Sequence, residues 1–492
     1  MSKTVKISEL MQTCGVKFGT SGARGLVADM NDEVCYTITA AFLQYLEKQN
    51  RLTDGGDRRV AIAGDLRSST GRIMAAVAKA VADAGCEAVN CGRIPSPAVA
   101  LYGLREKIPA VMVTGSHIPD DRNGIKYNTP AGEILKSDEA GIKEQEVEVP
   151  DAFSDDGMLT EPQALPDVVL DGRAAYVDRW LDAFAPDHLS GVKLGLYQHS
   201  AVGRDILFDV YAALGAEVTK LGWSDAFLPV DTEAIRPEDV DLAAAWAKEN
   251  DFDAIVSTDG DSDRPLISDE NGKWLRGDVA GILCAKFLGA DVVATPVSCN
   301  SAVDKCGWFT QVRRTRIGSP YVIAEMLAAV EGGAKCVVGY EANGGFLTAS
   351  PITLAAGTLA PLPTRDAIII HLGILSLAKQ KGVAISQLLA ELPQRVTASD
   401  RLKDFPTEKS KAKIAELTEG GAAAIEREFG SFGKVAHLDT TDGLRITFEN
   451  DEVLHLRPSG NAPELRCYTE ADSEVRARQQ NARGIQVLST WR

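Results

Sequence analysis

Three stretches of the chain repeat one pattern of apolar and polar positions. Each has a short apolar run, then a segment with apolar residues every three or four positions, then a second apolar run that ends at a polar loop. Short apolar runs bounded by turn residues are typical of buried strands, and the wider spacing is typical of helices. Each stretch therefore predicts strand, helix and strand, followed directly by a polar loop.

The predicted elements can be given by residue range. In the three stretches, the first strands are expected at 59–63, 192–197 and 291–294, the helices at 72–84, 205–214 and 321–330, and the second strands at 108–113, 252–256 and 334–338. Crossovers between parallel strands are right-handed, so each polar loop is expected at the same edge of its own sheet. Three such loops can enclose one cleft.

The last hundred residues have a different pattern. A helix is expected at 409–429 with an interruption at Gly420 and Gly421, followed by three alternating strands at 435–439, 444–449 and 452–457. This is an α+β arrangement. The predicted fold is α/β, with three similar mixed α/β domains around a central cleft and a smaller α+β C-terminal domain. The expected domains are 1–160, 161–275, 276–385 and 386–492.

Composition narrows the possible partners. The chain has 492 residues, enough for three or four domains, and a net charge of −17, which argues against nucleic acid and anionic membranes. Its nine cysteines form no C-x-x-C pair and are typical of reduced thiols in a cytosolic protein. The N-terminus has no apolar leader, and the apolar stretch 367–378 is too short to span a bilayer. We expect a cytoplasmic protein, monomeric or homodimeric.

The first polar loop, the serine loop (residues 114–121), places a serine at the end of a buried strand. Ligands in α/β proteins usually bind at that position, although a serine after glycine is also a common turn cap. His117 is adjacent to Ser116, and Lys126 follows ten residues later. Ser116 is therefore a candidate nucleophile with a cation nearby.

The second polar loop, the aspartate loop (residues 259–264), contains Asp259, Asp261 and Asp263. Three carboxylates at alternating positions suit a hard cation, and Mg²⁺ fits best because it accepts a few carboxylates together with a phosphate oxygen. A solvated acidic turn is one alternative. A calcium EF-hand fails because Arg264 stands where that loop needs glycine. An aspartyl-phosphate phosphatase using Asp259 is a further alternative, although Asp263 replaces its usual threonine or valine.

A serine beside a bound cation suits phosphoryl transfer, which depends on positioning and charge neutralisation. A phosphoryl group on Ser116 would carry close to two negative charges. We expect the cation, Lys126 and a helix N-terminus after Ser116 to stabilise it. Lys126 would act as general base if nearby cations lower its pKa. His117 is the other candidate base, although adjacent side chains usually point apart.

Two further loops offer ligand-binding groups. The glutamate loop (residues 339–346) presents Glu341 and Asn343 on a glycine-rich turn, and such groups bind sugar hydroxyls. In the arginine loop (residues 457–463), an arginine, a hydroxyl and free backbone N–H groups form an anion cradle for the phosphate that is not reacting. The cradle residues are Arg457, Ser459, Gly460 and Asn461.

Together, the four loops resemble the α-D-phosphohexomutase family over nearly the whole chain. The similar segments are 114–119, 259–264, 341–344 and 457–463, and they occur in the family's order. The segment 123–126 and the N-terminal loop with Arg24 are also similar to the family. The resemblance implies four domains around one cleft, three of them alike, with Mg²⁺ shared by the three aspartates and the phosphate on Ser116.

The resemblance also implies an activity. Phosphorylated Ser116 would pass its phosphoryl group to a hexose phosphate, forming a hexose 1,6-bisphosphate that turns over in the cleft and returns its other phosphoryl group. The result is interconversion of hexose 1-phosphate and hexose 6-phosphate, with mannose phosphates expected and glucose or glucosamine phosphates as alternatives. The residues expected to contact substrate are Arg24, Arg264, Glu341, Asn343, Arg457, Ser459, Gly460 and Asn461.

The chain departs from the family pattern at four positions. Ile118 replaces the usual asparagine of the serine loop, and Asn343 and Asn461 replace a serine and a threonine. Ser319 stands in a loop that often carries histidine, which favours Lys126 as the base. A calcium- or sugar-binding module without turnover is the alternative outside enzymes.

Overall fold

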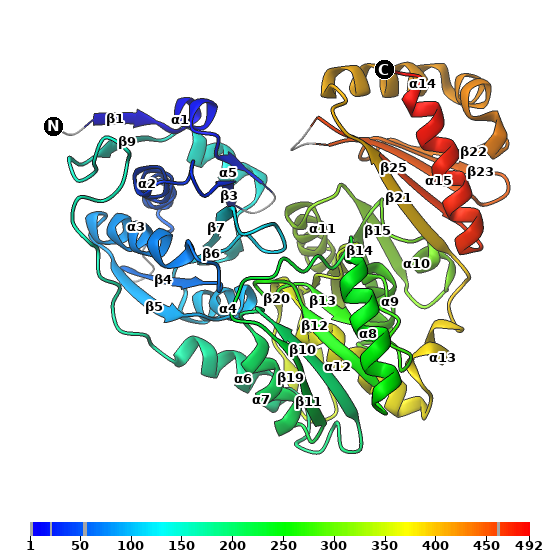
Figure 1. The fold of residues 1–492 in the computed structure, drawn as a ribbon, viewed down its shortest axis with the longest axis horizontal. Coiled ribbons are helices and arrows are strands. Elements are labelled where there is room, and N and C mark those ends of the chain that lie inside the picture. The colour runs from blue at the N-terminus through cyan, green and yellow to red at the C-terminus, as the bar shows by residue number, and fades with distance from the viewer. Residues whose placement is uncertain (1–2, 20–21, 53–56, 460–462) are drawn as a thin grey trace.

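The computed structural model of the chain describes residues 3–19, 22–52, 57–459 and 463–492. Within these residues the chain forms three α/β units and a fourth unit built on an antiparallel sheet (Figure 1). The predicted fold class is therefore confirmed.

The first unit comprises the elements from β1 to β9. They are β1 (Lys3–Lys6), α1 (Ile7–Thr13), β2 (Lys17–Phe18), β3 (Gly22–Leu26), α2 (Asp32–Lys48), β4 (Arg59–Gly64), α3 (Thr70–Asp83), β5 (Glu87–Gly92), α4 (Ser96–Glu106), β6 (Ala110–Val113), β7 (Arg122–Thr129), β8 (Gly132–Glu133), α5 (Lys136–Lys143) and β9 (Glu146–Val149).

The second and third units follow in the chain. The second comprises α6 (Asp171–Ala183), β10 (Lys193–His199), α7 (Arg204–Ala213), β11 (Glu217–Trp223), α8 (Pro237–Glu249), β12 (Ala254–Thr258) and β13 (Pro265–Ile267). The third comprises α9 (Gly277–Phe287), β14 (Val292–Pro296), α10 (Ala302–Lys305), β15 (Gln311–Thr315), α11 (Ser319–Glu331), β16 (Val337–Tyr340), β17 (Phe346–Thr348), β18 (Ile352–Thr353), β19 (Thr358–Leu359), β20 (Leu362–Asp366) and α12 (Ile368–Lys381).

The fourth unit is smaller, and its sheet has the order β21-β25-β24-β23-β22. The predicted helix interruption lies at Gly421, which has non-helical backbone angles inside α14. Helix α13 (Ile385–Leu389) precedes this unit and packs on the core of the first three units. The elements of the fourth unit are β21 (Val396–Leu402), α14 (Thr407–Phe429), a short 3₁₀ helix (Gly430–Phe432), β22 (Val435–Asp439), β23 (Leu444–Phe448), β24 (Val453–Pro458), β25 (Leu465–Ala471) and α15 (Glu474–Ser489).

The first three units repeat one strand order. Neighbouring strands run β5-β4-β6-β7 in the first, β11-β10-β12-β13 in the second and β15-β14-β16-β17 in the third. In each, the central strand pairs in parallel on both sides, and the fourth strand is antiparallel. The serine, aspartate and glutamate loops each join the third strand to the fourth. This shared connection places the three loops equivalently on their sheets, as the sequence pattern predicts.

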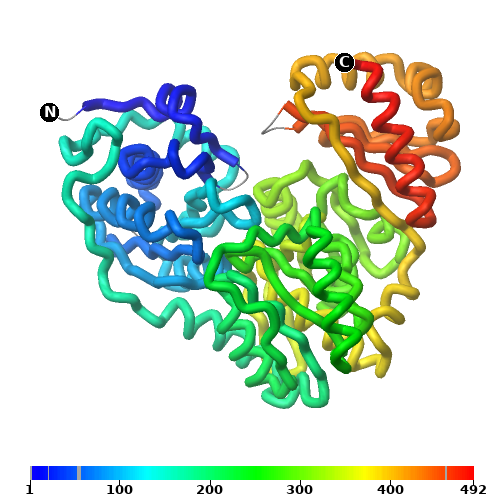
Figure 2. Tube along the Cα trace, viewed as in Figure 1, coloured from blue at the N-terminus to red at the C-terminus, as the bar shows by residue number. Residues whose placement is uncertain are grey.

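Apolar packing joins the first three units more closely than the fourth. One buried core includes Val99 of α4, Leu196 of β10 and Ile370 of α12, so it runs through all three. The fourth unit has its own core, around Phe429 and Phe448. The chain enters this unit through β21, shown in yellow and orange in Figure 2. Separate cores favour movement of the fourth unit relative to the others.

None of the helices in the described part of the chain is long and apolar enough to cross a membrane.

Candidate active site

The serine loop holds Ser116 in an unusual backbone conformation. Ser116 follows β6, is fully buried and has a φ angle of 55°. This left-handed region costs a residue with a side chain about 1–2 kcal/mol, so neighbouring contacts must impose it. The Ser116 N–H donates to Thr114 Oγ1 at 2.8 Å, and Thr114 Oγ1 donates to Asp65 Oδ2 at 2.7 Å. The loop is thus fixed before any ligand binds.

Arg67 also fixes the conformation of the serine loop, through hydrogen bonds to its carbonyl oxygens. Its guanidinium is buried, pairs with Asp65 at 3.1 Å and donates to the carbonyl oxygens of Ser116 and Ile118 at 2.7 and 2.6 Å. A Cβ on Gly115 would lie 2.6 Å from Arg67 Cζ, so this position needs glycine. Sequence reasoning missed Asp65 and Arg67. Both residues lie in the polar turn after the first strand of the first repeat, and this position is the sequence feature that could have indicated them.

The predicted helix N-terminus after Ser116 is wrong. The serine loop continues through turns into the antiparallel strand β7, with no helix between them. The Pro119 carbonyl accepts hydrogen bonds from Arg122 N and Arg67 Nη1, which closes the loop without helical geometry. Any negative charge on Ser116 must therefore be offset by side chains and a bound cation.

The aspartate loop lies against Ser116, although it belongs to the second unit. Ser116 Oγ donates to Asp259 Oδ2 at 2.5 Å. Asp259, Asp261 and Asp263 are buried, and their ligand atoms lie within 4.8 Å of one another. Asp261 Oδ1 and Asp263 Oδ1 are buried without a hydrogen-bond partner. Clustered carboxylate oxygens without partners fit a divalent cation held by oxygen ligands.

The pKa values of two aspartates in this loop are shifted in opposite directions. Burial and the neighbouring Asp261 and Asp263 raise the pKa of Asp259 well above its ordinary value. Burial would also raise the pKa of Asp263, but Arg365, Lys126 and Arg264 hold it below its ordinary value. A bound cation would complete this partial neutralisation.

Lys126 directly contacts two of the three aspartates of the aspartate loop. Its Nζ is 2.5 Å from Asp261 Oδ2 and 2.6 Å from Asp263 Oδ2. Burial alone would lower the pKa of Lys126, but these two carboxylates raise it above its ordinary value. The condition under which Lys126 would act as general base, a pKa lowered by nearby cations, is not met in this arrangement, because the carboxylates are closer.

His117 also differs from expectation, because its side chain turns back toward the neighbouring serine. His117 Nδ1 is 3.3 Å from Ser116 Oγ and accepts a hydrogen bond from Arg264 Nη1 at 2.9 Å. Burial and the adjacent Arg264 lower the pKa of His117 to about 3, so its ring is neutral at pH 7. Burial and Arg264 also lower the pKa of Arg24, to about 10.

The glutamate loop is a tight turn between β16 and β17. Glu341 N donates to the Gly345 carbonyl at 3.1 Å, and Asn343 Oδ1 accepts from Gly345 N at 2.9 Å. The Asn343 carbonyl accepts from Thr232 Oγ1 of the second unit at 2.7 Å. Glu341 pairs with Arg365 at 3.2 Å, a residue that sequence reasoning also missed.

The arginine loop reaches the site from the fourth unit. Arg457 Nε donates to Asp442 Oδ2 at 3.0 Å, and the same oxygen accepts from Ile317 N of the third unit at 2.9 Å. Ser459 is buried. Gly460 and Asn461 lie outside the described residues.

One cavity of about 480 Å³ connects these loops. Arg24 lines it from strand β3, not from a loop, and Arg457 and Ser459 line it from the fourth unit. Basic side chains outnumber the acidic ones, Glu233 and Glu341, although the whole chain is acidic. Such a lining suits a small anionic ligand. The basic residues are Arg24, Lys126, Lys136, Arg264, Arg365, Arg457 and Arg466.

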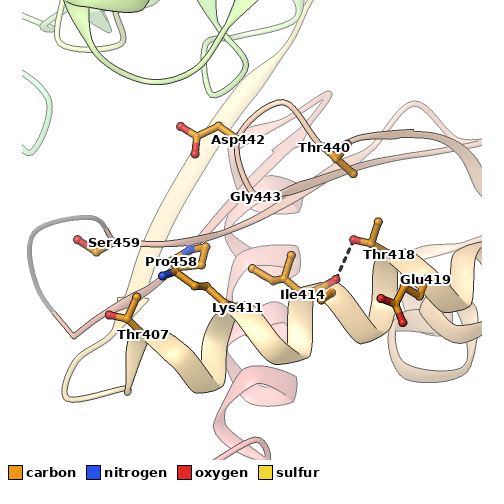
Figure 3. A pocket seen from close by; sticks show the side chains of 11 residues that line it. Thr407, Lys411, Ile414, Thr418, Glu419, Thr440, Asp442, Gly443, Pro458 and Ser459 are labelled. Carbon is orange, nitrogen blue, oxygen red and sulfur yellow. Dashed lines mark hydrogen bonds between the residues drawn. The ribbon is translucent and has the colours of Figure 1, made fainter. Parts of the chain in front are cut away.

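A second cavity, of about 560 Å³, lies within the fourth unit between α14 and the arginine loop (Figure 3). Lys411 and Ile414 line it from α14, and Asp442 and Ser459 line it from the opposite side. None of the serine, aspartate or glutamate loop residues lines this cavity, so it does not carry the chemistry of the site.

Comparisons with known proteins agree with the fold and with the loops. Four family models match in order: phosphoglucomutase/phosphomannomutase α/β/α domain I at residues 15–149, domain II at 174–272, domain III at 276–396 and the C-terminal domain at 403–485. The chain therefore belongs to the phosphoglucomutase/phosphomannomutase family, within the α-D-phosphohexomutases.

Two relatives are similar to this chain over nearly its full length. A phosphomannomutase of Salmonella muenchen is 44% identical, with 95% of this chain and 94% of the relative covered. A phosphomannomutase of Sinorhizobium fredii is 42% identical, with 97% and 99% covered. The solved structure of a phosphoglucomutase/phosphomannomutase family protein from Burkholderia thailandensis has a TM-score of 0.72 at 21% identity, with 96% of both chains covered, which supports the fold.

Proposed function

We propose that this chain is a phosphomannomutase that interconverts mannose 1-phosphate and mannose 6-phosphate through a phosphorylated Ser116. Two phosphomannomutases share 44% and 42% of its residues over nearly the whole length, which supports the reaction and the substrate. The observation that carries the mechanism is the contact of Ser116 Oγ with Asp259 Oδ2. Both residues are buried, and their neighbours His117 and Arg264 line a cavity rich in basic residues.

The first transfer moves a phosphoryl group from Ser116 to the sugar. The bond between phosphorus and Ser116 Oγ breaks, and a bond forms between phosphorus and the free hydroxyl oxygen of the sugar. The hydroxyl proton leaves the sugar, and Ser116 Oγ ends as a protonated hydroxyl. His117 and Lys126 are the candidates to carry this proton, since His117 lies 3.3 Å from Ser116 Oγ and Lys126 is part of the same charged cluster.

The second transfer is the reverse reaction on the other phosphate. The product of the first step is a hexose 1,6-bisphosphate, which also activates unphosphorylated enzyme. It must turn over so that its other phosphate faces Ser116. Arg457 and Ser459 line the far side of the cavity and would hold the distal phosphate in both orientations. Arg24, Arg264, Glu341 and Asn343 would bind and orient the sugar, and Gly460 and Asn461 complete the proposed cradle.

Asp259, Asp261, Asp263 and the phosphate on Ser116 would hold one Mg²⁺. When bound, the ion offsets negative charge on the phosphoryl group. Asp261 Oδ1 and Asp263 Oδ1 are buried oxygens that have no hydrogen-bond partner. The chain itself supplies Lys126, Arg264 and Arg365 around the same carboxylates, and these cations offset part of the carboxylates' negative charge.

A cytoplasmic location and a monomer or homodimer remain part of the proposal. All nine cysteines lie among the described residues and are free thiols, which fits a reducing compartment. The proposed domains are those expected from the sequence: 1–160, 161–275, 276–385 and 386–492.

A coupled assay tests the proposed substrate. Purified enzyme with Mg²⁺ and a trace of hexose 1,6-bisphosphate is given mannose 1-phosphate, glucose 1-phosphate or glucosamine 1-phosphate. The proposal expects the highest kcat/KM with mannose 1-phosphate. A higher value with either other substrate would contradict the mannose assignment, and no turnover of any of them would contradict the mutase.

A further inference from the structure

Arg365 occupies the space between the aspartate loop and the glutamate loop. It lies in β20 of the third unit, and its side chain is 3% exposed. It nevertheless lines the central cavity. The resemblance to known families assigned no role to this residue.

The guanidinium of Arg365 contacts one carboxylate in each loop. Arg365 Nε donates to Asp263 Oδ2 at 3.0 Å, and Arg365 Nη1 donates to Glu341 Oε2 at 3.2 Å. The planar group fixes the directions of its N–H donors relative to one another. One rigid group therefore relates the position of a proposed metal ligand to that of a proposed sugar ligand.

Hydrogen bonds through Ser319 link the same arginine to the first unit. Arg365 Nη1 donates to Ser319 Oγ at 3.1 Å, and Ser319 Oγ donates to Glu133 Oε2 at 2.8 Å. Glu133 Oε1 accepts a further hydrogen bond from Thr364 Oγ1 at 2.6 Å. Ser319, which stands where related loops often carry histidine, thus serves to anchor Arg365. The network spans three of the four units.

The stem of Arg365 also touches the backbone of the glutamate loop. A Cβ on Gly345 would lie 2.5 Å from Arg365 Cδ and 2.6 Å from Arg365 Cγ. Gly345 in turn closes the loop through its bonds to Glu341 and Asn343. There is therefore no room for a side chain at position 345, and the stem of Arg365 packs directly over the loop backbone.

We propose that Arg365 is a positioning residue that couples the aspartate loop to the glutamate loop, so that a divalent cation at the aspartates increases the affinity of the glutamate loop for the hexose phosphate. Asp263 would hold the cation through Oδ1 while Oδ2 accepts from Arg365 Nε, and the same guanidinium would orient Glu341 for the sugar hydroxyls. The inference rests on the proposed function, because it takes a hexose phosphate as the ligand.

Calorimetry on unphosphorylated enzyme tests the coupling. The dissociation constant of mannose 1-phosphate is measured with Mn²⁺ and after chelation, and the two values give a coupling ratio. We expect Arg365→Met to reduce this ratio at least threefold. Arg365→Lys keeps the charge but cannot reach both carboxylates in the same way, so it should restore folding stability and only part of the ratio.

Arg313→Met is the matched control. Arg313 lies in β15 of the same unit and pairs with Glu325 away from the cavity, so its loss should leave the ratio as in the wild type. A reduction smaller than threefold in Arg365→Met, or a wild-type ratio near one, would overturn the role of Arg365. If the wild type bound no hexose phosphate under either condition, the proposed function itself would be contradicted.

Discussion

Ser116 Oγ donates a hydrogen bond to Asp259 Oδ2 at 2.5 Å, although the two residues are 143 positions apart in the chain. The contact joins the first unit to the second. The backbones meet at the same place, because a Cβ on Gly260 would lie 2.7 Å from the Ser116 carbonyl oxygen. The nucleophile and the cation ligands are thus brought together by the docking of two loops.

Gly260→Ala should separate these loops. The added methyl group would meet the Ser116 carbonyl, and backbone atoms cannot yield as a flexible side chain can. We expect kcat/KM to fall by about tenfold or more, since small displacements of reacting groups are costly. Gly430→Ala is the control, because its Cβ would meet nothing within 4 Å. Equal kcat/KM in both variants would contradict the docking argument.

Ser116→Ala removes the oxygen that would carry the phosphoryl group. We expect kcat to fall roughly 10³-fold or more, because covalent transfer has no substitute in the cavity. Thermal unfolding should change little in comparison. An aspartyl-phosphate mechanism at Asp259 predicts the opposite, with substantial activity remaining in this variant. The coupled mutase assay separates the two.

Asp261→Asn should weaken the cation site. Asp261 Oδ1 is buried without a partner, and replacing the carboxylate removes one negative ligand. We expect Mn²⁺ affinity, measured by electron paramagnetic resonance, to fall by about 10²-fold, and activity after chelation to return only at higher Mg²⁺. Asp251→Asn, at a highly exposed surface carboxylate, should leave the affinity unchanged. Tight binding in Asp261→Asn would place the cation elsewhere.

Asp366 should make stability depend on pH. Its Oδ1 accepts a hydrogen bond from Tyr176 at 2.7 Å, and burial raises its pKa from 3.8 to about 6. The proton is bound more tightly in the folded state, so the stabilisation is complete below pH 4 and is lost as pH rises through 6. The loss amounts to about 3 kcal/mol by linkage.

Asp366→Asn stays uncharged throughout and should escape this loss. The difference in unfolding midpoint between variant and wild type, followed by circular dichroism from pH 4 to 7.5, should therefore shift in favour of the variant as pH rises. A difference that is constant over this range would show that the pKa of Asp366 is not raised in the folded protein.

The fold could be predicted largely from the chain because its three repeats have strong periodicity. The expected strand at 59–63 corresponds to β4 (Arg59–Gly64), and that at 435–439 corresponds to β22 (Val435–Asp439). Strand β11 was missed, since it is largely exposed and has little apolar alternation to reveal it. The helix expected after Ser116 was wrong because hydrogen bonds from Arg67 shape that loop, and no local pattern indicates them.

The candidate site likewise contains some residues that the sequence indicates and others that only the structure reveals. Ser116 and the three aspartates stand in short segments with recognisable spacing, so each was visible in the sequence. Arg67 and Arg365 were not, because each acts on a loop distant in the chain through buried contacts. The orientation of His117 toward Ser116 likewise depends on Arg264 from the second unit. The roles of such residues can be seen only in the folded structure, where the loops that they contact lie close to them.

The phosphorylation state of Ser116 distinguishes a phosphoserine mutase from every alternative mechanism. Wild-type enzyme and Ser116→Ala are each incubated with hexose 1,6-bisphosphate and Mg²⁺, and their intact masses are measured, followed by peptide mapping. We expect one added phosphoryl group on the wild type, located at Ser116, removed by excess hexose monophosphate and absent from Ser116→Ala. A wild-type protein that never carries a phosphoryl group, or carries it at another residue, would contradict this mechanism.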